Sequence, residues 1–232
     1  FEALKELNEL IENDSENTEF YFNRAICKKN LEDFTGAIKD YSLVLKRDPG
    51  DILCKLNRGN AYLAIEDFKN ALDDYNQVLI ADENNDTGFF NRGICQLQQG
   101  FFKEAIDDFN VAIRIDNDDS EYFHYRGNAK ISLNLISEGI EDYLKALSIS
   151  PHDQLLLLNL AQANYLIEEY ESSINYLDEV IEINSLNDLA YDSRGLAKLE
   201  IEDFIGAIND FDMALKIDSN CGGYYNHLGT AK

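Results

Sequence analysis

The sequence predicts an all-α fold built from a repeated pair of helices, and two features of the chain indicate it. Ala, Leu, Ile, Glu, Asn and Asp abound, while the 232 residues include only 2 prolines and 13 glycines, a composition that favours long helices over a turn-rich β fold. The sequence also matches itself at a period of 34 residues, without insertion or deletion. Since hydrophobic residues make up 45% of the chain and aromatic residues 11%, we expect it to be ordered throughout.

The period divides the chain into six full units. Residues 1–17 fit the second half of a preceding unit, and residues 222–232 fit the start of a further one. We therefore expect a single array over residues 1–232, cut from a longer array. The full units are 18–51, 52–85, 86–119, 120–153, 154–187 and 188–221.

Each unit is expected to form a helical hairpin. Small residues recur at positions 8 and 20 of the unit, and large apolar residues recur at positions 17 and 24. Positions 20, 21, 24, 27 and 28 form one apolar stripe at helical spacing. This pattern predicts a first helix over roughly positions 1–14 and a second over roughly positions 18–31, joined by a short polar turn. Because each hairpin leaves one face uncovered, a unit is stable only when its neighbours stack on it.

The repeat resembles that of the tetratricopeptide repeat (TPR) family in stretches such as NRGNAYLAIEDFKNALDDYNQVL (57–79) and NRGICQLQQGFFKEAIDDFNVAI (91–113). The resemblance extends over the whole chain and implies a right-handed α-α superhelix, or solenoid, of helix-turn-helix repeats. It also implies a scaffold that binds other proteins. The chain departs from the family pattern at position 32, which is proline only in Pro49 and Pro151, and at position 11, where Tyr62 is the one aromatic residue.

Arginine at position 7 and aspartate at position 23 occur together in five units. The fifth unit loses both at once and has Leu160 and Tyr176 instead. This covariation predicts an ion pair between the two helices of one unit, since the planar arginine fork suits a carboxylate. Coincidence in an acidic chain is the alternative. The predicted pairs are Arg24 with Asp40, Arg58 with Asp74, Arg92 with Asp108, Arg126 with Asp142, and Arg194 with Asp210.

The resemblance implies that positions 2, 5, 6, 9, 12 and 13 of the first helices line a concave peptide-binding groove. These positions are mostly apolar here, and contiguous exposed apolar surface commonly marks an interaction site. The alternative is that many of these side chains form the core between adjacent first helices. The predicted groove residues are Phe22, Asn23, Ile26, Leu53, Leu56, Asn57, Asn60, Leu63, Phe90, Asn91, Ile94, Leu97, His124, Asn128, Leu158, Asn159 and Gln162; Ile131, Leu155, Tyr165, Leu189, Leu196 and Leu199 occupy further groove positions.

Asparagine recurs at position 6 of the unit. A carboxamide both donates to and accepts from a peptide bond, so a row of asparagines could hold a peptide backbone whatever its side chains. Satisfaction by helix carbonyls or water is an equal alternative. The position-6 asparagines are Asn23, Asn57, Asn91 and Asn159.

The charge of the chain restricts its partners. Twenty Lys and Arg against 44 Asp and Glu give a net charge of −24 and a pI near 4.3, so nucleic acid and anionic membrane surfaces would be repelled. We expect a protein or peptide partner that is apolar with some basic character. The basic clamp with which some family members hold a terminal carboxylate is missing, because Leu56, Glu121 and Tyr125 stand at its positions.

We expect no enzyme activity, metal or cofactor. The acidic segments 82–86 and 116–121 lack the glycine and the glutamate of a calcium loop, and the chain has no phosphate loop, HExxH or GxSxG. No apolar stretch approaches the roughly 20 residues needed to span a bilayer. The cysteines show no CxxC, which favours free thiols and a cytoplasmic location. The cysteines are Cys27, Cys54, Cys95 and Cys221, and the histidines, which lack a metal-binding spacing, are His124, His152 and His227.

Three functions remain open. The first is an adaptor that binds an extended or helical peptide in the concave groove. The second is a regulatory arm that recruits substrates to a larger enzyme or to a secretion or assembly machine. The third is a structural spacer that self-associates through the open ends of the array.

Overall fold

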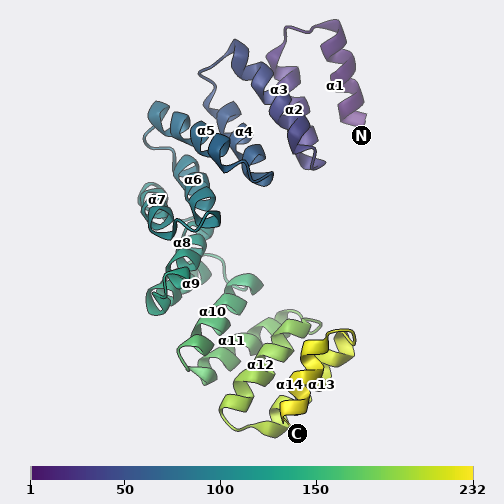
Figure 1. Cartoon of the computed structure of the whole chain (residues 1–232), viewed down its shortest axis with the longest axis vertical. Coiled ribbons are helices and arrows are strands. Elements are labelled where there is room, and N and C mark those ends of the chain that lie inside the picture. Colours follow the sequence, from purple (N-terminus) through teal and green to yellow (C-terminus); the bar gives the residue numbers. More distant parts are fainter. Residues whose placement is uncertain (1, 232) are drawn as a thin grey trace. The chain divides into compact units, whose positions relative to one another are not determined.

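The computed structural model describes residues 2–231, and over these residues the chain is entirely α-helical, with fourteen helices and no strand (Figure 1). The all-α prediction is confirmed. The helices of the first half are α1 (Glu2–Asn13), α2 (Thr18–Asn30), α3 (Phe34–Arg47), α4 (Ile52–Ala64), α5 (Phe68–Ala81), α6 (Asp86–Gln98) and α7 (Phe102–Ile115). Those of the second half are α8 (Ser120–Ser132), α9 (Ile136–Ile149), α10 (Gln154–Leu166), α11 (Tyr170–Ile183), α12 (Asp188–Glu200), α13 (Phe204–Ile217) and α14 (Gly222–Ala231).

The chain forms two compact units, Phe1–Asn117 and Asp118–Lys232. In the first unit the hairpins are α2–α3, α4–α5 and α6–α7, and neighbouring hairpins pack through α3 with α4 and α5 with α6. In the second unit the hairpins are α8–α9, α10–α11 and α12–α13, which pack through α9 with α10 and α11 with α12. Each hairpin is one 34-residue repeat, and within each unit the second helix of a hairpin packs against the first helix of the next, as stacking requires.

The turn inside each hairpin has a left-handed residue at position 15 of the repeat. Glu32 and Glu66 have φ of 62° and 59°, and Gly100 has φ of 81°. The next backbone N–H returns to a carbonyl five residues earlier, as from Asp67 to Tyr62 at 2.9 Å, which is the Schellman arrangement of a helix C-terminus. Second helices therefore cover positions 17–30, one residue earlier at each end than the sequence predicted.

The turns between hairpins end in an Asx residue at position 34 that caps the next first helix. Asn85 accepts a hydrogen bond from the backbone N–H of Gly88 at 2.8 Å, and Asp119 accepts one from Glu121 at 2.8 Å. Such caps satisfy amides that the first turn of a helix leaves unpaired. Asn85 and Asp119, in the polar segments 82–86 and 116–121, thus serve helix capping.

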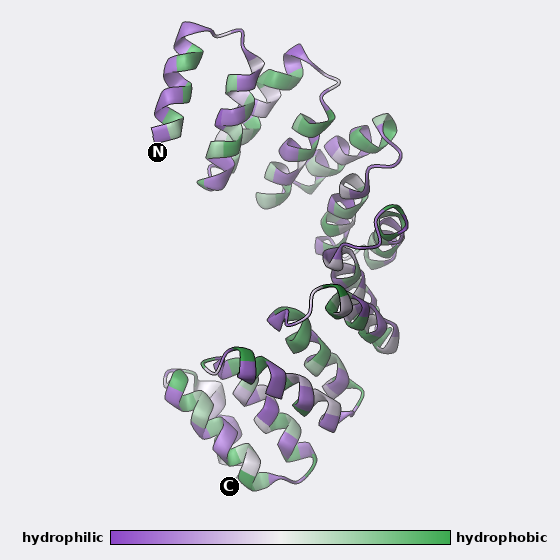
Figure 2. Ribbon diagram, turned by 180° about the vertical axis from the view of Figure 1, so that it is seen from behind, coloured by the Kyte–Doolittle hydropathy of each residue, from purple (hydrophilic) through white to green (hydrophobic). Residues whose placement is uncertain are grey.

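The core of each repeat is an apolar residue at position 24 packed against a small residue at position 8. Tyr41, Tyr75, Phe109 and Phe211 are fully buried at position 24. A Cβ atom added to Gly93 would lie 2.6 Å from the ring of Phe109, so only glycine fits this approach without movement of the ring. Figure 2 shows the resulting amphipathic helices, each with hydrophobic and hydrophilic residues on its surface.

Candidate functional site

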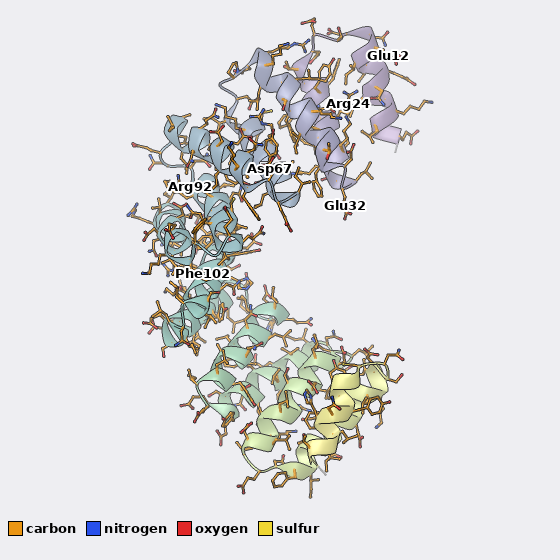
Figure 3. All side chains as sticks on the ribbon, viewed as in Figure 1. Glu12, Arg24, Glu32, Asp67, Arg92 and Phe102 are labelled. Carbon is orange, nitrogen blue, oxygen red and sulfur yellow. The ribbon has the colours of Figure 1, made fainter. Side chains whose placement is uncertain are left out.

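The five arginine–aspartate pairs of the sequence are present within their repeats, and each is bidentate. Arg24, labelled in Figure 3, donates from Nε and Nη2 to the two carboxylate oxygens of Asp40 at 2.8 and 2.7 Å. Arg92 contacts Asp108 in the same way at 2.7 and 2.6 Å. A bidentate pair of this kind fixes the angle between the two helices of a hairpin. The remaining pairs are Arg58 with Asp74, Arg126 with Asp142, and Arg194 with Asp210.

Sequence reasoning missed a second partner that four of these arginines have. The Nη1 of Arg92, which does not contact Asp108, donates to Asn76 at 2.7 Å, and Asn76 is at position 25 of the preceding repeat. One arginine therefore joins three helices. The same contact is made by Arg24 to Asn8, by Arg58 to Ser42 and by Arg194 to Asp178.

The signal for this second partner is in the sequence. The residue at position 25 before Leu160 is Leu144, in the fourth repeat, so the arginine, the aspartate and the position-25 partner are all replaced together. At Arg194 burial acts to lower the pKa, but hydrogen bonds to Asp210 and Asp178 outweigh it and hold the pKa above its ordinary value. This arginine therefore stays charged in its half-buried position.

Two predicted groove residues, Leu56 and Phe90, are buried in the core, so their assignment to an open groove was wrong. They are 9% and 8% exposed. The ring of Phe90 lies 5.8 Å from that of Phe109, and Leu56 packs in the same cluster as Tyr75. Position 5 therefore faces the second helix of its own repeat.

Further groove predictions also contact the core. Phe22 meets the ring of Tyr41 edge-on at 5.7 Å, and Leu63 packs against the core of the second repeat. The carboxamide oxygens of Asn60 and Asn128 accept hydrogen bonds from the hydroxyl groups of buried tyrosines. The distances are 2.8 Å from Tyr75 to Asn60 and 2.6 Å from Tyr143 to Asn128.

The position-6 asparagines do not form a uniform row. Asn57 donates to the carbonyl of Leu53 and accepts from Lys29, so it is satisfied locally. Asn159 is paired with the ring of His124. Among the other predicted groove residues, Asn23, Leu53 and Gln162 are exposed, and Ile26, Asn91, Ile94, Leu97 and Leu158 are half-buried.

A hollow of about 370 Å³ opens in the second unit between α10, α11 and α12. It contains the predicted residues Leu158, Asn159 and Gln162, and it has no charged side chain. Aliphatic side chains supply most of its wall, and carboxamide and hydroxyl groups stand among them. The lining residues are Leu155, Leu158, Asn159, Ala161, Gln162, Tyr165, Ser173, Leu177, Leu189, Ser193 and Leu196.

The hollow lies where the fifth repeat departs from the others at two core positions, and the smaller side chain at one of them leaves the space. Leu177 stands at position 24, where the other full repeats have an aromatic ring, and Ser173 stands at position 20, where alanine or glycine is usual. A leucine fills less space than a ring, and both residues line the hollow. The substitution at position 24 was visible in the sequence, but its effect on volume was not.

Polar contacts fix the rim of the hollow. The side-chain nitrogen of Asn159 lies 2.8 Å from Nε2 of His124, and this contact connects α10 to α8. Burial lowers the pKa of His124, and the neutral ring can accept from the carboxamide. Tyr165 donates to Glu200 at 3.1 Å, and burial followed by this hydrogen bond raises the pKa of Tyr165 to about 12. These hydrogen bonds limit the movement of the Asn159 and Tyr165 side chains at the rim of the hollow.

Residues 56–120 and 18–51 match family models described as tetratricopeptide repeat. Residues 18–51 and 56–120 are therefore tetratricopeptide repeats, as the sequence indicated. No curated protein matches the chain.

Solved structures show the same fold. YrrB, described as a TPR protein with an unusual peptide-binding site, has 17% identity and a TM-score of 0.70 over 82% of this chain and 97% of its own. The C-terminal part of a TPR repeat-containing protein from Cytophaga hutchinsonii has 18% identity and a TM-score of 0.76, over 98% of this chain and 93% of its own. A tetratricopeptide repeat protein from Parabacteroides merdae has 18% identity and a TM-score of 0.71, over 98% and 90%.

Residues 2–231 include no helix that is both long and apolar enough to cross a bilayer. In the same range, no three His, Cys, Asp or Glu side chains are grouped so that they could hold a metal ion. Burial raises the pKa of Cys54 to about 12 and that of Cys95 to about 11, which keeps both as thiols at neutral pH.

Proposed function

We propose that this chain is a protein-interaction scaffold whose hollow in the fifth repeat binds an apolar side chain of a partner polypeptide. One observation carries the proposal: the second unit has an uncharged, leucine-lined hollow in a chain whose net charge is −24. Burying an apolar side chain there would contribute about 1.5–3 kcal/mol. The similar fold of YrrB, which is described as having a peptide-binding site, supports the proposal.

The rim of the hollow suits a polypeptide backbone. Asn159, Gln162 and Ser193 offer both donors and acceptors beside the leucines. Charged groups of the ligand would stay outside, where the acidic protein attracts lysine and arginine. We therefore infer a segment with one large apolar residue flanked by basic residues, whose association rate falls as salt is added.

Selection of displayed random peptides on the intact chain, followed by calorimetry on the selected peptides, tests this proposal. Leu189 and Leu53 are both at position 2 of a repeat and are 59% and 57% exposed, so each tolerates substitution by aspartate without loss of core packing. Only Leu189 lines the hollow. Leu189→Asp is expected to weaken the selected peptides at least about tenfold, whereas Leu53→Asp should bind as the parent does.

The proposal fails if no peptide is enriched over the background. It also fails if the selected peptides bind Leu189→Asp and the parent chain equally well. Circular dichroism of both variants shows whether the fold is retained, so that a loss of binding reports on the hollow alone.

A further inference from the structure

A second hollow lies in the first unit, between α3, α4 and α5, and its charge is opposite to that of the whole chain. Its volume is about 300 Å³. Three of its lining residues are cationic and none is acidic, although the chain has 44 acidic residues against 20 basic ones. The lining residues are Ser42, Leu45, Lys46, Pro49, Lys55, Arg58 and Gln77.

The hollow results from one departure from the repeat pattern. At position 4 an aromatic ring usually lies beneath the arginine of position 7, as Phe89 does beneath Arg92 at 5.5 Å and Tyr191 beneath Arg194 at 5.4 Å. The second repeat has Lys55 at this position. Its arginine, Arg58, lies instead over Tyr62, at position 11, at 5.8 Å. The second repeat thus has a cation in place of the usual ring.

Asp74 holds Arg58 through Nε and Nη2 and offsets its charge. The two carboxylates of the adjoining turn are also engaged, since Asp48 accepts from the backbone of Gly50 and Asp51 accepts from that of Cys54.

The two lysines of this hollow have no carboxylate partner among the described residues. Within residues 2–231, Lys46 and Lys55 form no ion pair, whereas Lys28, Lys130 and Lys198 each contact the aspartate at position 23 of their repeat. The hollow therefore has two uncompensated ammonium groups.

We propose that this hollow binds a phosphate group carried on a side chain of a protein partner. Lys46 and Lys55 supply charge-assisted donors, and the hydroxyl of Ser42 is a neutral donor on the same wall. The amide nitrogen of Gln77 donates to Asp73 at 3.0 Å, which leaves its second N–H for a ligand. A phosphate brings a charge of about −1.5 to −2 at pH 7 and three acceptor oxygens, whereas a carboxylate brings one charge. The volume exceeds that of a phosphate, which leaves room for the side chain that carries it. This inference is independent of the apolar hollow in the second unit.

Titrations followed by backbone amide NMR test the site. The probes are inorganic phosphate, N-acetyl-O-phosphoserine N-methylamide and N-acetylglutamate N-methylamide, each at constant ionic strength set with chloride. Lys55→Tyr restores the ring that other repeats have at position 4 and should fill the hollow. Lys46→Glu reverses one charge at an exposed side chain, and Lys69→Gln removes a charge elsewhere in the first unit.

We expect saturable shifts of the amides around Gly50 and Lys55 with both phosphate probes. Binding should weaken at least about tenfold in Lys55→Tyr and in Lys46→Glu, and remain unchanged in Lys69→Gln. Tighter binding of phosphoserine than of inorganic phosphate would support a side-chain source. Tighter binding of inorganic phosphate would overturn that source. Equal binding of the glutamate probe, or shifts that persist in both hollow variants, would overturn the phosphate site.

Discussion

Asn60 accepts a hydrogen bond from the hydroxyl of Tyr75 at 2.8 Å, and this contact connects position 9 to position 24 of one repeat. Asn128 and Tyr143 repeat it in the second unit. Where position 9 is apolar, as in Leu196, position 24 is phenylalanine. The first repeat breaks this rule.

In the first repeat Ile26 is at position 9 and tyrosine remains at position 24. The hydroxyl of Tyr41 is buried and has no hydrogen-bond partner among the described residues. A buried hydroxyl without a partner destabilises the fold. The first repeat therefore has a defect that the second and fourth repeats do not have.

Matched tyrosine-to-phenylalanine variants at Tyr75 and Tyr41 should differ in their effect on stability. Tyr75→Phe removes the hydroxyl that donates a hydrogen bond to Asn60 and is expected to lower the free energy of unfolding by about 1 kcal/mol. Tyr41→Phe removes an unpaired buried hydroxyl and should leave stability unchanged or raise it by up to about 1 kcal/mol. Urea unfolding measures both, and equal losses in the two variants would contradict the assignment.

The arginine–aspartate pair of the third repeat can be tested by a double-mutant cycle. Arg92→Leu leaves the buried carboxylate of Asp108 unpaired, and we expect a loss of about 3 kcal/mol. Arg92→Leu with Asp108→Tyr reproduces the residue types of the fifth repeat and should recover most of it. Adding Asn76→Leu, which corresponds to Leu144, should recover more. If the single losses simply add, the two residues are not coupled.

The repeat period, the helices and the ion pairs could be predicted because each follows from a residue type that recurs at fixed spacing. The position-25 partner was harder to find because it lies in the preceding repeat and varies among Asn, Ser and Asp. The groove assignment erred at Leu56 and Phe90 because spacing along a helix does not tell whether a side chain faces the next repeat or its own second helix.

Neither hollow could be predicted in this way. Each arises where a single side chain differs in size or charge from its counterparts, as Leu177 and Lys55 do. The consequence of such a difference depends on whether the neighbouring helices close over the space, which only coordinates show.

The left-handed turn inside each hairpin gives a prediction about backbone strain. Glu66 has φ of 59°, which costs a residue with a Cβ atom about 1 kcal/mol, and glycine avoids that cost. Glu66→Gly is therefore expected to raise the free energy of unfolding by up to about 1 kcal/mol, less the entropy that glycine adds to the unfolded chain.

Gly100 occupies the equivalent turn at φ of 81° and provides the reverse experiment. A Cβ atom there would meet nothing within 4 Å, so Gly100→Ala changes backbone strain without a steric clash. We expect a loss of about 1 kcal/mol. Thermal unfolding of both variants measures the effect, and a stabilised Gly100→Ala protein would show that the turn is unstrained.

The contact between His124 and Asn159 predicts how stability depends on pH. Burial lowers the pKa of His124 in the folded protein, and Asp153 opposes this shift more weakly. The unfolded chain has the ordinary histidine pKa of 6.5 and binds more protons than the folded chain below that pH. The contribution of the neutral ring is therefore present above pH 6.5 and is lost as the pH falls through the lowered pKa of the folded state.

His124→Gln keeps a hydrogen-bonding group opposite Asn159 but cannot titrate. The difference in unfolding free energy between the parent chain and this variant should be constant above pH 6.5 and should shift in favour of the variant as the pH falls. Carboxylates that titrate in both proteins cancel in that difference. His152→Asn, at an exposed turn residue with φ of 69°, is the control, because it replaces a histidine and leaves the contact between His124 and Asn159 in place. A difference for His124→Gln that does not vary with pH would mean that the ring is protonated as readily in the folded chain as in the unfolded one, and that it does not act as a neutral acceptor for Asn159.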